Sequence, residues 1–325
     1  MLAYLIRRAM QAAVAVLVMA VLVFLGVYAV GDPVDILISP EADLAEIEEA
    51  RRRLGLDRPL IEQFGIFLAN ALRGDLGRSF VHNEPALRLI LERLPATLEL
   101  AVAAMAIAIL LGIPLGMLAG LRHDRPSGKA IMAGSILGFS LPNFWQGLML
   151  IMLFAVILGW LPAGGRGETV PLFGVEVSFL TLNGLQHLLL PAVNLAIFKT
   201  ALVIRLTRAG TREVMLQDYV KFARAKGLSE RRVVLVHMLK NILIPVVTVL
   251  GLEFGSVVAF AVVTETVFAW PGMGKLLIDS ILNLDRPVVV AYLMLIVLVF
   301  ILVNFLVDVL YTLLDPRVRL AERHG

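Results

Sequence analysis

The sequence predicts an all-α integral membrane protein with six transmembrane helices. Three observations carry this prediction. The 325 residues are 59% hydrophobic and only 17% charged, and the mean hydropathy of +0.87 is too high for a soluble domain of this size. Six apolar runs are each long enough to cross a hydrocarbon core of about 30 Å. Lysines and arginines gather in alternate connections between these runs.

The first apolar run extends from Ala9 to Val30 and is interrupted only by Gln11. A secretory signal peptide is the competing interpretation, but its apolar region would span only about 7 to 15 residues and end at a small-residue cleavage site. We therefore expect a retained membrane helix within an N-terminal segment of residues 1–31. The long polar stretch that follows predicts an extracytoplasmic loop subdomain over residues 32–96.

A membrane core is expected over residues 97–314 and contains the other five spans. The third run is longer than one span needs, and Pro142 with Asn143 predicts a break inside it whose freed backbone groups must be satisfied within protein. The expected spans two to six are Thr97–Leu121, Ala130–Leu161, Leu188–Ile204, Ile242–Val263 and Val288–Leu314.

Small residues at helical spacing predict close helix packing in two of these spans. In the second span Gly112, Gly116 and Gly120 recur every fourth residue, and the fifth span contains Gly251 and Gly255. Glycines in such rows let helix backbones approach each other in lipid.

The distribution of cations predicts the orientation. One side of the six spans holds Arg7 and Arg8, a basic turn at residues 122–129, nine cations from Arg205 to Lys240, and a basic tail at residues 315–325. Short loops rich in lysine and arginine remain in the cytoplasm, so both termini are expected there. The opposite side has few cations in its short loops, and its eight arginines lie in the long 32–96 loop, which the rule largely exempts.

The most strongly patterned segment is the basic stretch between spans four and five. Five residues recur at helical spacing and predict a short amphipathic helix with apolar and small side chains on one side: Val214, Asp218, Tyr219, Phe222 and Ala223. Gly227 can adopt the left-handed conformation that ends such a helix, and Ser229 is placed to cap a second one with its side chain. Small residues at Ala223, Ala225 and Gly227 would admit another protein surface. An interfacial helix on lipid headgroups is the alternative.

No catalytic constellation is found. Five scattered histidines and no cysteine leave neither a metal site nor a nucleophile with its base, so no enzyme activity, metal or cofactor is expected. The stretch Gly272-Met273-Gly274-Lys275 lacks the spacing of a phosphate-binding loop. Any energy from ATP must therefore come from another polypeptide, and this inference favours a docking role for the basic helix.

Glu253 is the one ionisable residue expected near the middle of a span. A carboxylate in hydrocarbon costs several kcal/mol unless it is paired, hydrated or protonated, so it must face protein or water. It is a candidate for the substrate pathway, where it would meet a positive group. The alternative is a carboxyl group that is hydrogen-bonded across a subunit interface beside Gly251 and Gly255. Lys199 is expected close enough to the end of its span to reach the interface.

Several stretches together resemble a known family. The basic segment DYVKFARAKGLSERRVVLVHMLKNILIPVV is accompanied by GLDRPLIEQF and GDLGRSF in the first outer loop, RLPATLELA entering span two, SLPNFW in span three and ETVFAWPGMGKLL after span five. In this order they resemble binding-protein-dependent ABC transporter permeases of the dipeptide, oligopeptide and nickel group, and in detail the first permease of the pair. The aligned Lys221-Phe222-Ala223 matches the general superfamily triplet only at its alanine.

The resemblance implies a coupling helix within residues 211–240 that fits a cleft in an ATP-binding subunit. By this resemblance the coupling helix and its end contain Asp218, Tyr219, Ala223, Ala225, Gly227 and Leu228. Phe222 is a further candidate for the contact because of its place on the amphipathic side. The resemblance further implies a bacterial inner-membrane importer with a second homologous permease, two ATP-binding subunits and an extracytoplasmic substrate-binding protein. Membrane lipid is the remaining partner, and no nucleic acid is expected.

The substrate implied by the resemblance is a di- or oligopeptide. Relatives with similar permeases carry nickel chelates, glutathione, opines or oligosaccharides, and no residue separates these possibilities. Two other classes remain: an ATP-independent channel or proton-coupled carrier that uses Glu253 as a relay, and a membrane scaffold or receptor without transport.

Overall fold

The computed structural model of the chain is almost entirely helical. It describes residues 2–29, 43, 46, 48, 49, 52 and 57–314. Residues 30–42 of the expected outer loop and the expected cytoplasmic tail at 315–325 lie outside this range.

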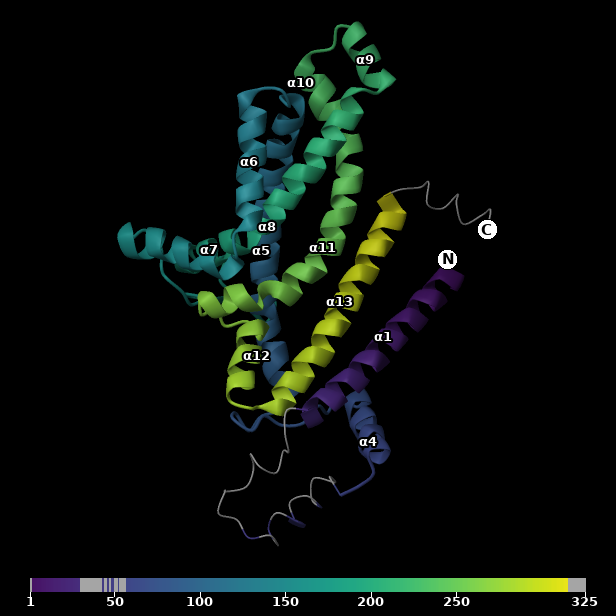
Figure 1. Ribbon diagram of the computed structural model, residues 1–325, viewed down its shortest axis with the longest axis vertical. Helices are drawn as coiled ribbons and strands as arrows, with labels where there is room; N and C mark the ends of the chain where they lie inside the picture. The colour runs from purple at the N-terminus through teal and green to yellow at the C-terminus, as the bar shows by residue number, and fades with distance from the viewer. Residues whose placement is uncertain are drawn as a thin grey trace. The chain divides into compact units, whose positions relative to one another are not determined.

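The described residues form long apolar helices joined by short helices and one β-ribbon (Figure 1). In chain order the elements are α1 (Leu2–Ala29), α4 (Leu60–Leu72), α5 (Ala86–Leu121), α6 (Pro126–Ser140), α7 (Asn143–Leu150), the π-helix η1 (Ile151–Ile157), β1 (Val170–Leu172), β2 (Val175–Val177), α8 (Leu182–Met215), α9 (Asp218–Ala225), α10 (Glu230–Arg232), the π-helix η2 (Val233–Met238), α11 (Leu239–Val267), α12 (Met273–Leu282) and α13 (Arg286–Leu314).

Four helices have the length and apolarity to cross a membrane: α5, α8, the part of α11 from Pro245 to Val267, and the part of α13 from Arg286 to Val307. Helix α6 and the continuous segment formed by α7 and η1 can together supply a fifth, bent span. Within α1, Met10–Gly26 forms a shorter apolar stretch. The described residues thus supply four to five apolar spans where the sequence predicts six.

The third expected span is bent where Pro142 predicts a break. The chain turns by 105° between α6 and the segment Asn143–Ile157, and Figure 1 shows α7 running across the direction of α6. Leu141 adopts an extended conformation, as the residue before a proline tends to do. The buried Gln146 side chain donates to the carbonyls of Gly138 and Leu141 at 2.8 and 2.9 Å. These bonds satisfy acceptors that the break sets free.

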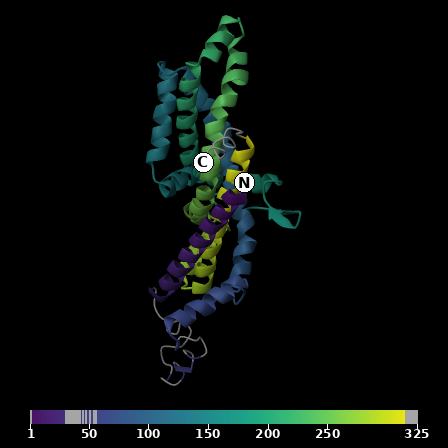
Figure 2. The ribbon, with the colours of Figure 1, turned by 90° about the vertical axis from the view of Figure 1, so that its right-hand side faces the viewer.

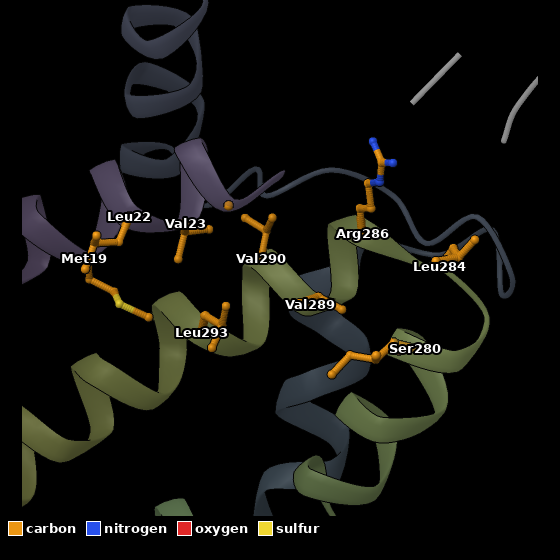
Figure 3. A pocket seen from close by; sticks show the side chains of 11 residues that line it. Met19, Leu22, Val23, Ser280, Leu284, Arg286, Val289, Val290 and Leu293 are labelled. Atoms are coloured by element: carbon orange, nitrogen blue, oxygen red, sulfur yellow. The ribbon is translucent and has the colours of Figure 1, made fainter. Parts of the chain in front are cut away.

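The chain divides into two compact units, and each is described separately. The first comprises residues 1–94 and 276–301. Its core is built from Ala20 and Val23 of α1 with Val290 and Met294 of α13, and aromatic residues of α4 pack against it. Helices α1 and α13, with the end of α12, border an apolar pocket (Figure 3). Buried Ser79 donates a hydrogen bond to the carboxylate of buried Asp285, which ties the GDLGRSF stretch to the start of α13.

The second unit comprises residues 95–275 and 302–325. In it α8 packs against α6, α7 and α11. The antiparallel strands β1 and β2 form a ribbon that stands out from these helices (Figure 2). At the end of α8 and α11 away from α7, the chain forms the small helices α9 and α10 (Figure 1).

The second unit also shows a close approach of α5 to α8 along one glycine row. A Cβ atom added at Gly112, Gly116 or Gly120 would come within 2.6 Å of the Cβ atoms of Val203, Thr207 and Thr211 respectively, listed in the same order. Real Cβ contacts are never this short, so only glycine permits this spacing of the two backbones.

Candidate functional site

The short helix α9 begins later than the sequence pattern suggests. Helix α8 continues to Met215, so Val214 belongs to α8 and is buried there. A turn closed by the bond from the Gln217 amide to the Val214 carbonyl, 3.1 Å long, separates the two helices. The predicted grouping of Val214 with the apolar side of the short helix is therefore wrong. The hydrophobic period simply continues across the turn.

Gly227 ends α9 in the predicted conformation. Its φ is +76°, in the left-handed region, and the Leu228 amide donates back to the Ala223 carbonyl at 3.3 Å. A Cβ atom at Gly227 would meet nothing within 4 Å, so the requirement for glycine here is conformational and not steric. Ser229 stands directly before α10 as predicted, but its side chain makes no capping bond, and that part of the prediction is wrong.

Helix α9 has one buried side and one exposed side. Val220 and Ala223 are buried, whereas Tyr219 and Phe222 are 41% and 61% exposed. The exposed surface of α9, as we call it below, consists of the residues Asp218, Tyr219, Lys221, Phe222 and Ala225. Gly227, just after the helix, is also exposed, and Leu228 is half-buried. Of the α9 residues grouped on one side from the sequence, Ala223 is therefore the one that packs against the chain itself.

Polar contacts fix α9 to the elements that follow it. The Asn241 side chain at the start of α11 donates to the Tyr219 hydroxyl at 2.7 Å. Arg224 forms an ion pair with Glu230 at 2.9 Å, which joins α9 to α10. The Lys226 ammonium lies 4.6 Å from the centre of the Phe222 ring. A displacement of α9 would therefore be transmitted to α8 and α11 and not absorbed by movement of α9 alone.

A second site is the cavity of about 520 Å³ bordered by α6, α7, α8 and α11. Its walls combine aromatic rings, amides and one ion pair: Phe139, Leu141, Asn143, Gln146, Asn194, Leu195, Phe198, Lys199, Glu253, Ser256, Val257 and Phe260. Cavities of this size with a few polar groups are typical of small-ligand sites.

Glu253 has an intrachain partner that the sequence analysis did not assign. The Lys199 ammonium lies 2.5 Å from a Glu253 carboxylate oxygen and donates to Ser256 Oγ at 2.8 Å. Because α8 extends to Met215, Lys199 lies in the middle of that helix, and the expectation that it reaches the interface is wrong. The pair is neutral overall, which lowers the cost of both charges in hydrocarbon. The carboxylate remains about one-third exposed to the cavity.

Amides and a hydroxyl line the same cavity beside this pair. The Asn194 side-chain amide donates to Thr264 Oγ1 at 3.1 Å and to Asn143 Oδ1. Asn194 is 1% exposed, and its own Oδ1 has no hydrogen-bond partner. An unpaired buried acceptor is costly, so it offers a strong site for a ligand N–H group. The SLPNFW stretch contributes Asn143 to this group.

The two glycines near Glu253 lie on α11. A Cβ atom at Gly251 would come 2.5 Å from a methyl group of Val307 on α13, and Gly255 is buried. These positions are compatible with helix packing, and the carboxylate between them pairs with Lys199 of α8.

The turn between α11 and α12 is anchored on α5 by buried polar groups. Fully buried Glu265 accepts from Thr97 Oγ1 at 2.6 Å and from the Lys275 amide at 3.0 Å. The indole of buried Trp270 donates to the Ala96 carbonyl at 2.9 Å. A Cβ atom at Gly272 would collide with the Glu265 carboxylate. The stretches RLPATLELA and ETVFAWPGMGKLL are therefore two halves of one contact, which we call the α11–α12 anchor (Thr97, Glu265, Trp270, Lys275).

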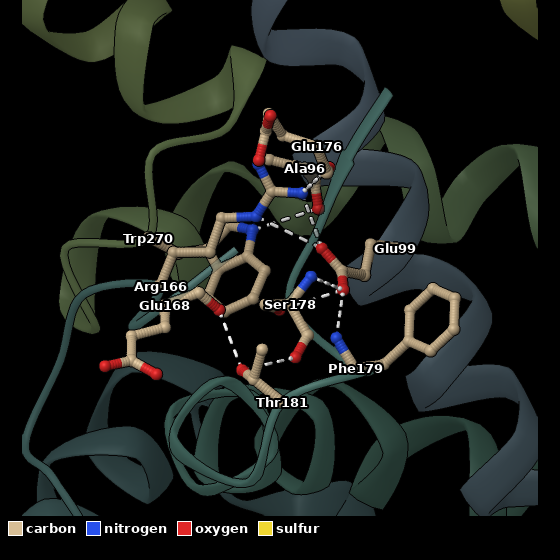
Figure 4. A network of polar contacts seen from close by, with 9 residues as sticks. All are labelled: Ala96, Glu99, Arg166, Glu168, Glu176, Ser178, Phe179, Thr181 and Trp270. Carbon is tan, nitrogen blue, oxygen red and sulfur yellow. Dashed lines mark hydrogen bonds and ion pairs between the residues drawn. The ribbon is translucent and has the colours of Figure 1, made fainter. Parts of the chain in front are cut away.

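Glu99, two residues further along α5, holds the loop before α8 (Figure 4). Its carboxylate pairs with Arg166 at 2.7 Å and accepts from the Ser178 amide at 2.7 Å and the Phe179 amide at 2.9 Å. Thr181 then caps α8 by accepting from the Gly184 amide. The cluster fixes both ends of the β1–β2 ribbon.

Sequence reasoning missed Lys199, Asn194, Thr97, Glu99 and Arg166. The sequence shows only that some of these residues need a partner, because a lysine, an asparagine and a glutamate lie inside or beside apolar runs. The partners lie 51 to 168 residues away, and nothing local identifies them. In the part of the chain that the structure describes, no group of three or more His, Asp or Glu residues is arranged to hold a metal ion.

Comparisons with known proteins agree over the whole chain. Residues 112–320 match the family model described as binding-protein-dependent transport system inner membrane component, and residues 1–101 match the model of its N-terminal region. The chain is 43% identical over 302 residues to the di/tripeptide transport system permease protein DppB of Pseudomonas aeruginosa, covering 89% of this chain and 90% of that protein.

A second relative and a solved structure extend this result. The chain is 40% identical over 320 residues to the glutathione transport system permease protein GsiC of Escherichia coli strain K12, covering 98% of this chain and 99% of that protein. A structure of the MetNI methionine ABC transporter in an inward-facing conformation aligns with a TM-score of 0.58 at 17% identity, covering 71% of this chain and 99% of that chain. At that identity the likeness concerns the fold alone.

Proposed function

This chain belongs to the family of inner-membrane permeases of binding-protein-dependent ABC importers, and on that premise we propose that it carries short peptides across the bacterial inner membrane. The relatives are named for di/tripeptides and for glutathione, which makes a peptide the best-supported substrate class. Glutathione itself, nickel chelates, opines and oligosaccharides are the competing cargoes of the same machinery.

The exposed surface of α9 is the observation that carries the mechanism. It presents Tyr219 and Phe222 on a helix that is fixed to two long membrane helices, α8 and α11. Exposed aromatic side chains on a rigid support are typical of a protein docking site. In this proposal α9 is the coupling helix, and ATP is hydrolysed by two partner subunits. A second homologous permease and an extracytoplasmic substrate-binding protein complete the importer.

The topology is part of the proposal. Six spans with both termini in the cytoplasm place α9 inside and the β1–β2 ribbon outside. The chain has no cysteine, so single cysteines introduced at exposed Asp124, Glu176 and Ala225 are unambiguous reporters. A membrane-impermeant maleimide applied to intact spheroplasts should label only the variant at Glu176. Labelling of Ala225→Cys from outside would invert the orientation.

The cavity around Glu253 is our candidate for the substrate pathway. A peptide carries an ammonium and a carboxylate group, and these can exchange for the Lys199–Glu253 pair without leaving a charge uncompensated in the membrane. Asn194, whose Oδ1 is unpartnered, lies in the wall of this cavity, and we propose that a peptide N–H group bonds to it once the cavity is occupied. A cavity whose two charges balance suits a zwitterionic cargo better than a cavity with one unpaired carboxylate, which is what the sequence predicts.

The decisive experiment for the function is reconstitution. The permease pair, the two ATPases and the cognate binding protein are placed in liposomes, and uptake is measured for a panel of dipeptides, tripeptides, glutathione and nickel chelates. We expect peptide uptake that requires both ATP and the binding protein. Uptake by the isolated chain, or uptake of a non-peptide cargo alone, would contradict the proposal.

The pathway role is tested separately with a double-substitution cycle. Glu253→Gln and Lys199→Met should each lower peptide uptake about tenfold, because each leaves the other charge without its partner. The neutral double variant K199M/E253Q decides the matter, with co-purification of the complex as the control for assembly. A pair that only stabilises the fold predicts recovered uptake in the double variant, whereas a pathway role predicts that uptake stays low.

A further inference from the structure

The apolar pocket of the first unit shares no lining residue with the cavity around Glu253. It has a volume of about 470 Å³ and is lined by apolar side chains of α1 and α13 with residues from the end of α12 (Figure 3). The lining side chains from α1 are Met19, Leu22 and Val23, and those from α13 include Val289, Val290 and Leu293. An apolar pocket between two apolar helices accommodates a hydrocarbon chain.

Arg286 stands at one end of this pocket, at the first residue of α13 (Figure 3). The residue is only 7% exposed, yet its Nε and Nη1 atoms have no hydrogen-bond partner. A guanidinium group in such a position is costly because its N–H groups have lost water and gained nothing. Buried arginines are ordinarily paired with an anion.

The neighbouring carboxylate does not supply that anion. Asp285 accepts from Ser79 Oγ and from the Phe80 amide at 3.1 Å, and this contact turns it towards the preceding loop. Within the described ranges no carboxylate lies within the 4.0 Å ion-pair distance of Arg286.

From this combination we infer that the pocket binds an anionic glycerophospholipid of the membrane. The headgroup phosphate accepts from the Arg286 guanidinium, whose Nε and Nη1 atoms have no partner and whose planar shape suits phosphate. One acyl chain lies along the apolar side chains of α1 and α13. A free anion would use only Arg286 and leave the apolar lining empty, so the occupant must be an amphiphile. The lipid would join α1 to α13 within the first unit.

The test is native mass spectrometry of the whole importer complex, purified in mild detergent and titrated with dioleoylphosphatidylglycerol. We expect one tightly retained lipid for each copy of this chain. Arg286→Gln should weaken retention about tenfold, and Arg286→Lys should weaken it less, because lysine keeps the charge but loses the fork. The matched control is Arg73→Gln, an exposed arginine of the same unit outside the pocket.

The acyl contact has its own variant pair. Leu22 and Leu25 are both exposed leucines of α1, at 60% and 53%, but only Leu22 lines the pocket. Leu22→Trp should fill the pocket and reduce lipid retention, while Leu25→Trp should leave it unchanged. Dioleoylphosphatidylcholine and inorganic phosphate are the competitors.

Three results would overturn the inference. They are unchanged phosphatidylglycerol retention in Arg286→Gln, equal retention of phosphatidylcholine, and displacement of the lipid by millimolar inorganic phosphate with no effect of Leu22→Trp. None of these depends on which solute the importer carries.

Discussion

Two regions of the second unit are built on opposite principles. The α11–α12 anchor buries Glu265 and Trp270 completely and satisfies them through bonds to residues about 170 positions earlier in the chain. The α9 helix buries only Val220 and Ala223, leaves two aromatic rings exposed, and is tied down by contacts within about 25 residues. One region has its polar groups satisfied within this chain, and the other leaves a surface exposed that we propose to be a docking site.

This difference separates a region that resists deformation from a region where, in our proposal, a partner subunit applies force. Buried polar bonds in a low-dielectric interior are strong when complete and costly when broken, so the anchor holds the turn rigidly on α5. Another protein can contact the exposed surface of α9 without disrupting buried contacts of this chain. Because α9 is fixed to α8 and α11, displacing it would move these long helices and not only a loop.

The largest effect is expected at the anchor. Glu265→Ala removes the acceptor for the Thr97 hydroxyl and the Lys275 amide and leaves both donors buried, at a cost of about 3 kcal/mol in the free energy of unfolding. A denaturation series on the purified complex measures the shift. Glu265→Gln, which keeps the shape and one acceptor, is the control and should lose less. Equal losses in both variants would mean that volume, and not hydrogen bonding, holds the turn.

A somewhat smaller effect is expected where Glu99 holds the loop before α8. Arg166→Met removes the ion pair but keeps the side-chain length, and we expect a loss of about 2 kcal/mol, because Glu99 is left with only the neutral donors of Ser178 and Phe179. Limited proteolysis should then cut the β1–β2 ribbon faster than in the unmodified protein. An unchanged cleavage rate would show that the amide bonds suffice to fix the ribbon.

At α9 the expected effect is on coupling and not on stability. Ala225→Trp places bulk on the exposed surface of α9 and should reduce peptide uptake about tenfold while ATP hydrolysis by the complex continues. Gly227→Ala adds almost no bulk but strains a residue at φ +76°, so it separates backbone strain from obstruction. Uptake and ATPase rates measured together distinguish the two. Normal coupling in Ala225→Trp would remove α9 from the contact.

The smallest effect is expected for a charge on the same exposed surface. Lys221 pairs with Asp218 at 2.9 Å, and both side chains are largely exposed. Lys221→Ala should change the free energy of unfolding by no more than about 0.5 kcal/mol, because water screens such pairs. Any larger change would show that the exposed surface of α9 is already structurally engaged within the chain.

The sequence by itself determined the features that depend on local chemistry and on the solvent. Apolar runs gave the long helices, because hydrocarbon forces every backbone group into an internal bond. Pro142 gave the break in the third apolar run, and Gly227 gave the end of α9, because each restricts or permits particular backbone angles. The family resemblance added the expectation that α9 contacts an ATP-binding subunit.

Only the tertiary structure decided which distant groups meet. Lys199 and Glu253, Thr97 and Glu265, and Glu99 and Arg166 are each unremarkable in their own stretches, and hydropathy shows only that they need partners. Which partner each finds depends on how helices pack, and that is set by close approaches such as the one between α5 and α8. The side of α9 that is buried was decided in the same way, because Val220 and not Phe222 fits the space beside α8 and η2.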